Sequence, residues 1–347
     1  MIEIFQERIR QAAQRRAPLR LRGGGSKDFY GNAPQGELLD TRGHAGIVSY
    51  EPTELVVTAR GGTSLSQLEN ALLEKGQFLP FEPPHFGHEA TLGGSIAAGL
   101  SGPRRVSAGA LRDYILGAKI LDGRGRLLAF GGQVMKNVAG YDVSRLLAGS
   151  LGTLGLIVEA SLKVLPRPAE EVTLRLALDA KGALETLGGW AARPLPVSAT
   201  AWHDGALAVR LSGAAPAVRA ATRRIGGEPG NGALWTELRE HTHAFFSGAQ
   251  PLWRIALPPT AAPLALTGAQ LIEWGGALRW LRTDAPAGDV RAAAQRTGGH
   301  ATLFRAADKS PGAFTPLDPV KLRLHRALKQ AFDPAGILNP GRMYAEF

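Results

Sequence analysis

The sequence contains no cysteine and no long apolar run, and each absence excludes a class of site or protein. Without cysteine, the 347-residue chain cannot form disulfides, thiolate metal sites or cysteine-held iron–sulfur clusters. No stretch of roughly 18 or more consecutive apolar residues occurs, so no transmembrane segment is expected. Residues 1–10 alternate charged and apolar side chains and lack the uninterrupted apolar core of a signal peptide. We therefore expect a cytoplasmic protein.

Concentrated positive charge is also missing, although the formal net charge is +10. The basic residues gather only in short pairs, such as Arg15-Arg16, Arg104-Arg105 and Arg223-Arg224. Neither a long basic run nor a stacking-aromatic motif accompanies them, so the sequence argues against nucleic acid as a partner. Solvated arginine-rich faces explain the charge, and an acidic protein partner or an anionic substrate is the alternative.

Glycine, in contrast, is abundant, with 44 residues, and three glycine-rich turns recur in the first half of the chain. They cover residues 22–26, 91–95 and 149–155. Glycine reaches positive φ without a Cβ penalty and exposes its N–H, so such turns can form concave nests that bind a pyrophosphate. A dinucleotide is therefore the first ligand to consider.

The residues that follow these turns exclude the commonest dinucleotide sites. In a Rossmann or P-loop site the glycines open directly into a helix that faces the phosphates. Residues 26–34 have turn chemistry instead, and residues 156–165 alternate apolar side chains at period two, which predicts a strand. Strand-to-strand loops would therefore hold the phosphates.

Periodicity and capping signals predict an α+β chain with a break at the Pro166-Arg167-Pro168 segment. Ser64 with Gln67 forms a capping box that starts a helix, Gly76 ends it, and a strand near residues 78–81 would complete a β-α-β segment. The expected strands cover residues 18–22, 54–59, 119–121, 126–128, 156–165, 172–176, 206–211, 252–257, 277–281 and 301–305. The expected helices cover residues 2–16, 64–75, 215–225, 234–246, 287–296 and 319–332.

Four ordered blocks carry a resemblance to a known family. Residues 21–26, 83–94 and 136–155 resemble the PCMH-type FAD-binding domain of the vanillyl-alcohol-oxidase flavoprotein superfamily, and residues 332–341 are similar to the tail of its FAD-linked oxidases. Within that superfamily the whole chain most resembles the FAD-binding E subunits of bacterial glycolate oxidases. The resemblance implies an α+β fold with a two-part FAD-binding domain over residues 1–168. A smaller α+β cap domain over residues 169–315 would follow, with a helix and tail over residues 316–347 returning to the FAD domain.

The same resemblance implies which residues contact FAD. The expected contacts are Gly23, Gly24, Gly25, Ser26, Lys27, Pro84, Thr91, Gly93, Gly94, Ser95, Gly149, Gly152, Thr153, Gly155, Ile157 and Asn339. Relatives with covalent flavin carry a histidine in the first glycine loop, where this chain has Ser26 or Lys27, so non-covalent FAD is expected. Lys27 either pairs with the pyrophosphate or is a solvated surface lysine. Thr91 or Ser95 could also simply begin a helix.

No metal site and no catalytic base can be assigned from the sequence. His85 with His88, and His241 with His243, have spacings seen in metal-binding pairs. His241 and His243 are two residues apart and would not share a face of a helix, and the spacing places no third ligand for either pair. Catalytic hydroxy-acid dehydrogenases of the superfamily carry an H-x-G-D-G-N-x-H block. The late segment compared with it, residues 298–305, departs from that pattern.

The resemblance therefore implies an FAD-binding subunit of a glycolate oxidase complex, acting on glycolate or a related 2-hydroxy acid. A homologous catalytic flavoprotein subunit and an iron–sulfur subunit are the implied partners, and the complex could hold the chain peripherally at the inner membrane. Two alternatives stay open. The FAD could be structural or an electron relay in a non-catalytic partner, or the chain could be a stand-alone FAD oxidoreductase acting on a sugar derivative.

Overall fold

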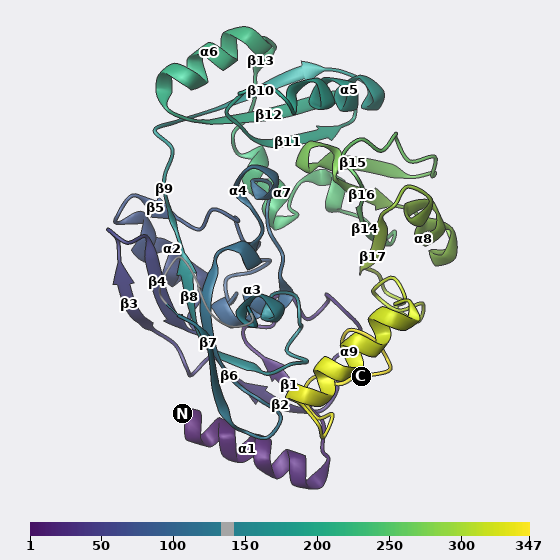
Figure 1. The fold of residues 1–347 in the computed structure, drawn as a ribbon. Helices are drawn as coiled ribbons and strands as arrows, with labels where there is room; N and C mark the ends of the chain where they lie inside the picture. Colours follow the sequence, from purple (N-terminus) through teal and green to yellow (C-terminus); the bar gives the residue numbers. More distant parts are fainter. Residues whose placement is uncertain (133–141) are drawn as a thin grey trace.

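The computed structural model describes residues 1–132 and 142–347, so residues 136–141 of the third resembling block lie outside the described part. The chain forms two lobes, and the C-terminal helix α9 runs from the upper lobe of Figure 1 back to the lower one. Helices and sheets are mixed in both lobes, which confirms the expected α+β fold.

The first lobe holds the N-terminal half of the chain. Its elements are α1 (Ile2–Arg15), β1 (Leu19–Arg22), β2 (Glu37–Asp40), β3 (Ile47–Glu51), β4 (Val56–Arg60), α2 (Leu65–Leu73), β5 (Gln77–Phe78), α3 (Leu92–Ala98), α4 (Arg105–Ala108), η1 (Leu111–Asp113), β6 (Ile115–Leu121), β7 (Leu127–Gly131), η2 (Ser144–Leu147), β8 (Leu156–Lys163) and β9 (Leu165–Pro166). β1 and β2 form a parallel pair. The main sheet is antiparallel, in the order β3-β4-β8-β6-β7.

Strand β8 lies at the centre of this sheet because its apolar residues are buried on both sides. Val158 packs with Phe5 and Ile9 of α1. Leu162 packs in the main core, which includes Leu68 of α2. Helix α2 begins where the capping box predicts, since the Ser64 side chain accepts a hydrogen bond from the amide of Gln67.

The second lobe is built on one eight-stranded antiparallel sheet, in the order β13-β10-β12-β11-β15-β16-β14-β17. Its elements are β10 (Glu170–Ala177), α5 (Ala180–Trp190), β11 (Val197–His203), β12 (Ala206–Gly213), α6 (Ala215–Ile225), β13 (Glu228–Pro229), α7 (Leu234–Glu240), η3 (Ala244–Phe246), β14 (Leu252–Ala256), β15 (Ala269–Glu273), η4 (Trp274–Gly276), β16 (Leu278–Arg282), α8 (Ala287–Arg296) and β17 (His300–Arg305). The final helix is α9 (Pro319–Phe332).

Alternation along the strands gives this sheet two buried faces. Val209 of β12 packs with Ala183 of α5 and Val218 of α6 on one face. The neighbouring Ala208 belongs to a second cluster, which also contains Tyr30 of the first lobe. This inner face therefore forms the contact between the lobes.

The chain after α9 returns to the first lobe and is anchored by a buried ion pair. Lys329 Nζ lies 2.7 Å from Asp333 Oδ2 and donates to the carbonyl oxygens of Thr153 and Leu338 at 3.0 and 2.7 Å. Burial lowers the pKa of Lys329, and the carboxylate of Asp333 opposes that shift. Leu338 then forms a parallel bridge with Leu19 of β1.

Several elements differ from the sequence-based expectation. The predicted strand at residues 78–81 is wrong: β5 covers only Gln77–Phe78 and pairs with β9 rather than joining the main sheet. The strands β2, β3, β11 and β15 and the helix α5 were not expected. Helix α5 contains Gly182, Gly188 and Gly189, which lower helix propensity, so packing against the sheet has to stabilise it.

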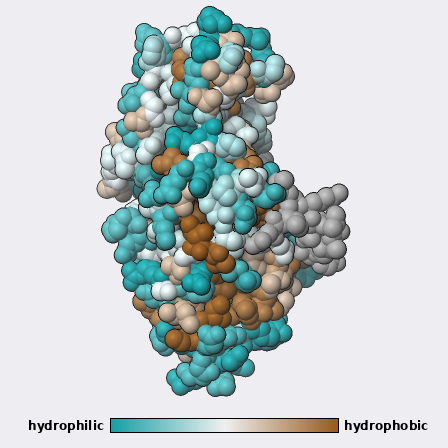
Figure 2. All heavy atoms as spheres, turned by 90° about the vertical axis from the view of Figure 1, so that its left-hand side faces the viewer, coloured by the Kyte–Doolittle hydropathy of each residue, from teal (hydrophilic) through white to brown (hydrophobic). Residues whose placement is uncertain are grey.

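The surface of the first lobe carries exposed apolar side chains. Figure 2 shows an apolar band over the first lobe on the face seen from the side of β3, within a largely hydrophilic surround. Across residues 1–132 and 142–347, none of the helices combines the length and apolar character needed to cross a membrane.

Candidate cofactor-binding site

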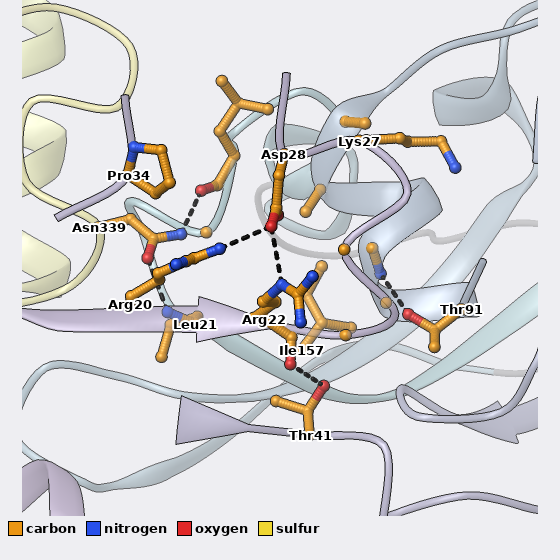
Figure 3. A pocket seen from close by; sticks show the side chains of 18 of the residues that line it. Arg20, Leu21, Arg22, Lys27, Asp28, Pro34, Thr41, Thr91, Ile157 and Asn339 are labelled. Carbon is orange, nitrogen blue, oxygen red and sulfur yellow. Dashed lines mark hydrogen bonds and ion pairs between the residues drawn. The ribbon is translucent and has the colours of Figure 1, made fainter. Parts of the chain in front are cut away.

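The largest concentration of the expected contact residues surrounds one cleft of about 820 Å³ in the first lobe (Figure 3). We call it the glycine-loop cleft, because residues 22–27 form one wall. The N-terminal turn of α3, the turn at Gly152 and Asn339 of the C-terminal tail complete the lining. Four segments that are far apart in sequence therefore meet here.

The glycines of the first loop are required by close backbone contacts. A Cβ on Gly24 would lie 1.6 Å from the carbonyl oxygen of Glu89, and one on Gly23 would lie 2.2 Å from Oγ1 of Thr91. Gly25 has φ +74°, a left-handed conformation that favours glycine. These glycines thus let the loop approach the segment before α3.

The same loop presents unused hydrogen-bond donors to the cleft. The backbone N–H groups of residues 23–27 form no hydrogen bond within the described part of the chain. The next amide, that of Asp28, donates to Gly25 O at 3.0 Å and closes the loop. Consecutive amides of this kind form a nest with a partial positive charge. The loop can therefore hold an anion such as a pyrophosphate.

Two arginines on β1 add positive charge to the cleft. Arg20 Nη2 and Arg22 Nε share the Asp28 carboxylate, at 2.6 and 2.7 Å, as the dashed lines in Figure 3 show. Arg342 of the tail donates to the carbonyl oxygen of Asp28 at 2.8 Å, and burial lowers its pKa to about 10. Sequence reasoning missed these four residues. The Arg-x-Arg spacing, which puts two guanidinium groups on one side of a strand, was the available signal.

Lys27 is partly enclosed rather than a solvated surface lysine. Its Nζ donates to His85 O at 3.2 Å and lies 5.7 Å from the ring centre of Phe86. Burial lowers the pKa of Lys27 to about 8, and the carboxylate of Glu240 opposes this shift.

The backbone amides at the N-terminus of α3 already donate to oxygen atoms of the protein. Thr91 Oγ1 accepts from the Gly94 amide at 3.2 Å, and the Gly93 amide donates to Gly61 O at 2.8 Å. Ser95 is buried, and its Oγ has no hydrogen-bond partner among the described residues. The expectation that Thr91 begins a helix is confirmed.

Asn339 connects the tail to two walls of the cleft. Its Oδ1 accepts from the Leu21 amide at 2.7 Å, and its Nδ2 donates to Leu151 O at 2.6 Å (Figure 3). Gly152 is required beside it, since a Cβ there would lie 2.6 Å from Asn339 Nδ2. The buried amide of Asn339 thus holds the strand that leads into the glycine loop.

The cleft gathers most, but not all, of the expected contact residues. Those that line it are Gly23, Gly24, Gly25, Ser26, Lys27, Thr91, Gly93, Gly94, Gly152, Gly155, Ile157 and Asn339. Pro84 instead lines a small cavity between the lobes. Gly149 and Thr153 line a cleft beside α9, and Ser95 is buried in α3 and is not part of the lining of the glycine-loop cleft.

Aromatic side chains occupy the contact between the lobes beyond Lys27. Phe29 lies 5.5 Å from Phe86 and 5.3 Å from Phe304, ring centre to ring centre, and His241 stacks on Phe246 at 3.8 Å. Burial holds the pKa of His241 well below its usual range, and the nearby arginine charges lower it further, so this imidazole is neutral. In the described part of the chain, no group of three or more His, Asp or Glu side chains is placed to hold a metal.

One carboxyl group on the inner face of the second lobe has an unusual environment. Burial raises the pKa of Glu273 to about 7, although Trp280 donates to its Oε2 at 2.7 Å. Glu273 and Arg254 both line the small cavity that also contains Pro84. It is therefore a candidate proton acceptor that sequence reasoning did not find, because nothing in its local sequence indicates burial.

Two family models match the chain. The model described as "FAD binding domain" matches residues 2–131, and the one described as "FAD linked oxidases, C-terminal domain" matches residues 307–343. The described glycine loop, the walls of the cleft around α3 and Asn339 fall within these two matches.

Known proteins resemble the chain to different extents. Glycolate oxidase subunit GlcE of Escherichia coli (strain K12) is 50% identical over 340 residues, which cover 98% of this chain and 96% of that protein. Glycolate oxidase subunit GlcD of Bacillus subtilis (strain 168) is 34% identical over 47% of this chain and 35% of its own length. A solved structure of alkyldihydroxyacetonephosphate synthase has a TM-score of 0.67 at 15% identity, covering 96% of this chain and 74% of that chain, which indicates a shared fold.

Proposed function

This chain belongs to the family of FAD-linked oxidases, which makes it an FAD-dependent oxidoreductase, and we propose that it serves as the FAD-binding subunit of a glycolate oxidase complex. The end-to-end identity of 50% with a protein of that name carries the proposal. The complex would oxidise glycolate, or a related 2-hydroxy acid, to the 2-oxo acid.

The residues of the glycine-loop cleft fit FAD. The free amides of residues 23–27 would hold the pyrophosphate, with Arg20 and Arg22 adding positive charge beside it. No cysteine occurs in the chain and no histidine among the described residues lines the cleft, so FAD would be held non-covalently. Bound FAD would supply redox chemistry, either as an acceptor of hydride or as a relay of electrons.

The contact between the lobes indicates what the flavin of this chain does within the complex. The aromatic rings of Phe29, Phe86 and Phe304 pack against one another beside Lys27, and no group of three or more His, Asp or Glu side chains among the described residues is placed to hold a metal. These features favour a flavin that relays electrons or stabilises the subunit over one that oxidises glycolate unaided.

Partner subunits would supply what this chain lacks. A homologous catalytic flavoprotein subunit would take the substrate, and an iron–sulfur subunit would take the electrons, because this chain has no cysteine to hold a cluster. The apolar band of Figure 2 is the kind of surface that partner proteins cover. We place the assembled complex in the cytoplasm, where its partners could attach it to the inner membrane.

Purification of the chain with and without its partners tests the proposal. The isolated chain should be yellow, release intact FAD on denaturation and reduce an artificial acceptor with glycolate at a rate far below that of the complex. General-base catalysis contributes about 10²–10⁴-fold, which sets the scale of the expected difference. A rate for the single chain equal to that of the complex would contradict the subunit assignment, and a colourless chain would contradict the cofactor assignment.

A further inference from the structure

A second cavity, of about 900 Å³, lies between the lobes at the end of α3, and its charged lining has no part in the flavin proposal. Gly99, which ends α3, forms part of its wall. Arg105 and Arg112 line it from the first lobe, and Arg254 and His300 line it from the second. We call it the arginine cavity.

No acidic side chain lines the arginine cavity. In the described part of the chain, the side chains of Arg105, Arg112 and Arg254 form no ion pair or hydrogen bond, and residues 133–141 contain no aspartate or glutamate that could pair with them. Another inner-face arginine behaves differently, because Arg210 is paired with Glu82 at 2.9 Å. The three arginines of the cavity therefore have no carboxylate partner comparable to Glu82 within the described part of the chain.

The positive groups act on one another through the cavity. Burial lowers the pKa of Arg105, and the charges of Arg254 and Arg112 lower it further. Asp113 and Glu273 attract Arg105 and Arg254 respectively, but neither carboxylate lines the cavity. A bound anion would relieve this repulsion directly.

Trp274 holds two of the three guanidinium groups without consuming their donors. The guanidinium carbons of Arg105 and Arg254 lie 4.5 and 5.1 Å from the centre of its ring. Such cation–π contacts position a guanidinium group while leaving its N–H groups available. Guanidinium forks match the paired oxygens of a carboxylate or phosphate.

We propose that the arginine cavity binds a small oxygen-donor dianion, a dicarboxylate or inorganic phosphate, through Arg105, Arg112 and Arg254. Three positive charges from two lobes exceed what one carboxylate would neutralise, so a dianion fits the cavity better than a monoanion. Bound there, the dianion would also link the two lobes. The site is independent of whether the glycine-loop cleft holds FAD.

Titration calorimetry on the purified, FAD-loaded chain at low ionic strength tests the proposal with oxalate, inorganic phosphate and acetate. FAD keeps phosphate out of the glycine-loop cleft. We expect one saturable site for oxalate or phosphate, with acetate at least about tenfold weaker. Tighter oxalate binding would identify a dicarboxylate site, and tighter phosphate binding would identify a phosphate site. Equal affinity for acetate, or no saturable binding of either dianion, would overturn the proposal.

Matched variants locate the bound anion. Arg112→Gln and Arg105→Gln should each weaken dianion binding by about tenfold, because each removes a charged donor. Arg112 is exposed and makes no hydrogen bond in the described part of the chain, so its variant should fold normally. Arg223→Gln, at an exposed position of α6, removes the same charge away from the cavity and should bind as tightly as the unmodified chain. Unchanged affinity in both cavity variants would refute the site.

Discussion

The first glycine loop and the N-terminus of α3 are both glycine-rich and both line the glycine-loop cleft, yet their backbone amides are used differently. The amides of residues 23–27 form no hydrogen bond in the described part of the chain, whereas those of residues 92–95 are all bonded within the protein. Glycine is needed in the loop to bring two backbones together. In α3 it lies at the start of a helix whose donors are already satisfied.

This contrast separates two meanings of a glycine-rich motif. Residues 23–27 can hold an anion because their donors remain free, and the contact with Glu89 fixes the shape of the loop. Gly93 and Gly94 leave room beside the cleft without donating to a ligand there. Phosphate binding should therefore be sensitive to substitution in the loop and tolerant of a small side chain at Gly94 of α3.

The largest expected effect is that of Gly24→Val. The new side chain would collide with the carbonyl oxygen of Glu89, which lies 1.6 Å from the Cβ position. Overpacking of this kind costs about 1–3 kcal/mol. It would also displace the amides of residues 23–27 from the arrangement that can bind a pyrophosphate. We expect the purified variant to contain no measurable FAD, determined from its absorption spectrum after denaturation.

Gly94→Ala is the matched control in α3. A Cβ on Gly94 would meet only Thr91 Oγ1, at 3.1 Å, and alanine favours a helix by about 0.5–1 kcal/mol over glycine. This variant should keep its FAD and unfold at an equal or slightly higher temperature. Loss of FAD from Gly94→Ala, or full FAD content in Gly24→Val, would reverse the assignment of the two regions.

A smaller effect is expected from Asn339→Gly, which tests whether the tail positions the loop. Glycine accepts the positive φ of 44° at this position but removes the hydrogen bonds to Leu21 and Leu151. The free energy of unfolding should fall by about 1–3 kcal/mol, because buried backbone groups lose their partners. FAD should still bind, with lower affinity, as measured by titration of the FAD-free protein. Unchanged denaturation and affinity would show that the tail has no part in the site.

Local signals predicted the parts of the fold that short segments determine. The Ser64 cap and the alternation along residues 156–165 gave α2 and β8, since capping and periodicity are properties of neighbouring residues. Strand β11 was missed because its sequence contains small and polar residues that only the inner face of the sheet buries.

The candidate site, like the fold, was predictable only where neighbouring residues carry the signal. The glycine loop could be found in the sequence because glycine marks both close approach and positive φ. Arg254 and Glu273 could not, because their unusual environments arise from packing between segments far apart in the chain. Four charged residues of the cleft, Arg20, Arg22, Asp28 and Arg342, were also missed. Their partners lie across the glycine loop or in the C-terminal tail, so no local pattern pairs them.

The smallest effect concerns Lys27, whose ammonium group lies 3.3 Å from the hydroxyl of Ser26 in the same loop. Its pKa in the FAD-free protein is about 8, below the ordinary value of 10.5, because burial disfavours the charged form. The buried charge is therefore unfavourable below pH 8, and the FAD-free protein should gain stability as the pH rises from about 8 to 10.5. A pyrophosphate nearby favours the protonated lysine, so FAD affinity should fall in the same direction, by up to about tenfold for each pH unit above 8. Fluorescence titration of FAD at pH 7 and 9 measures this slope. Lys27→Met should abolish the slope while leaving the affinity of the loop amides in place, and an equal slope in both proteins would show that Lys27 does not face the bound phosphates.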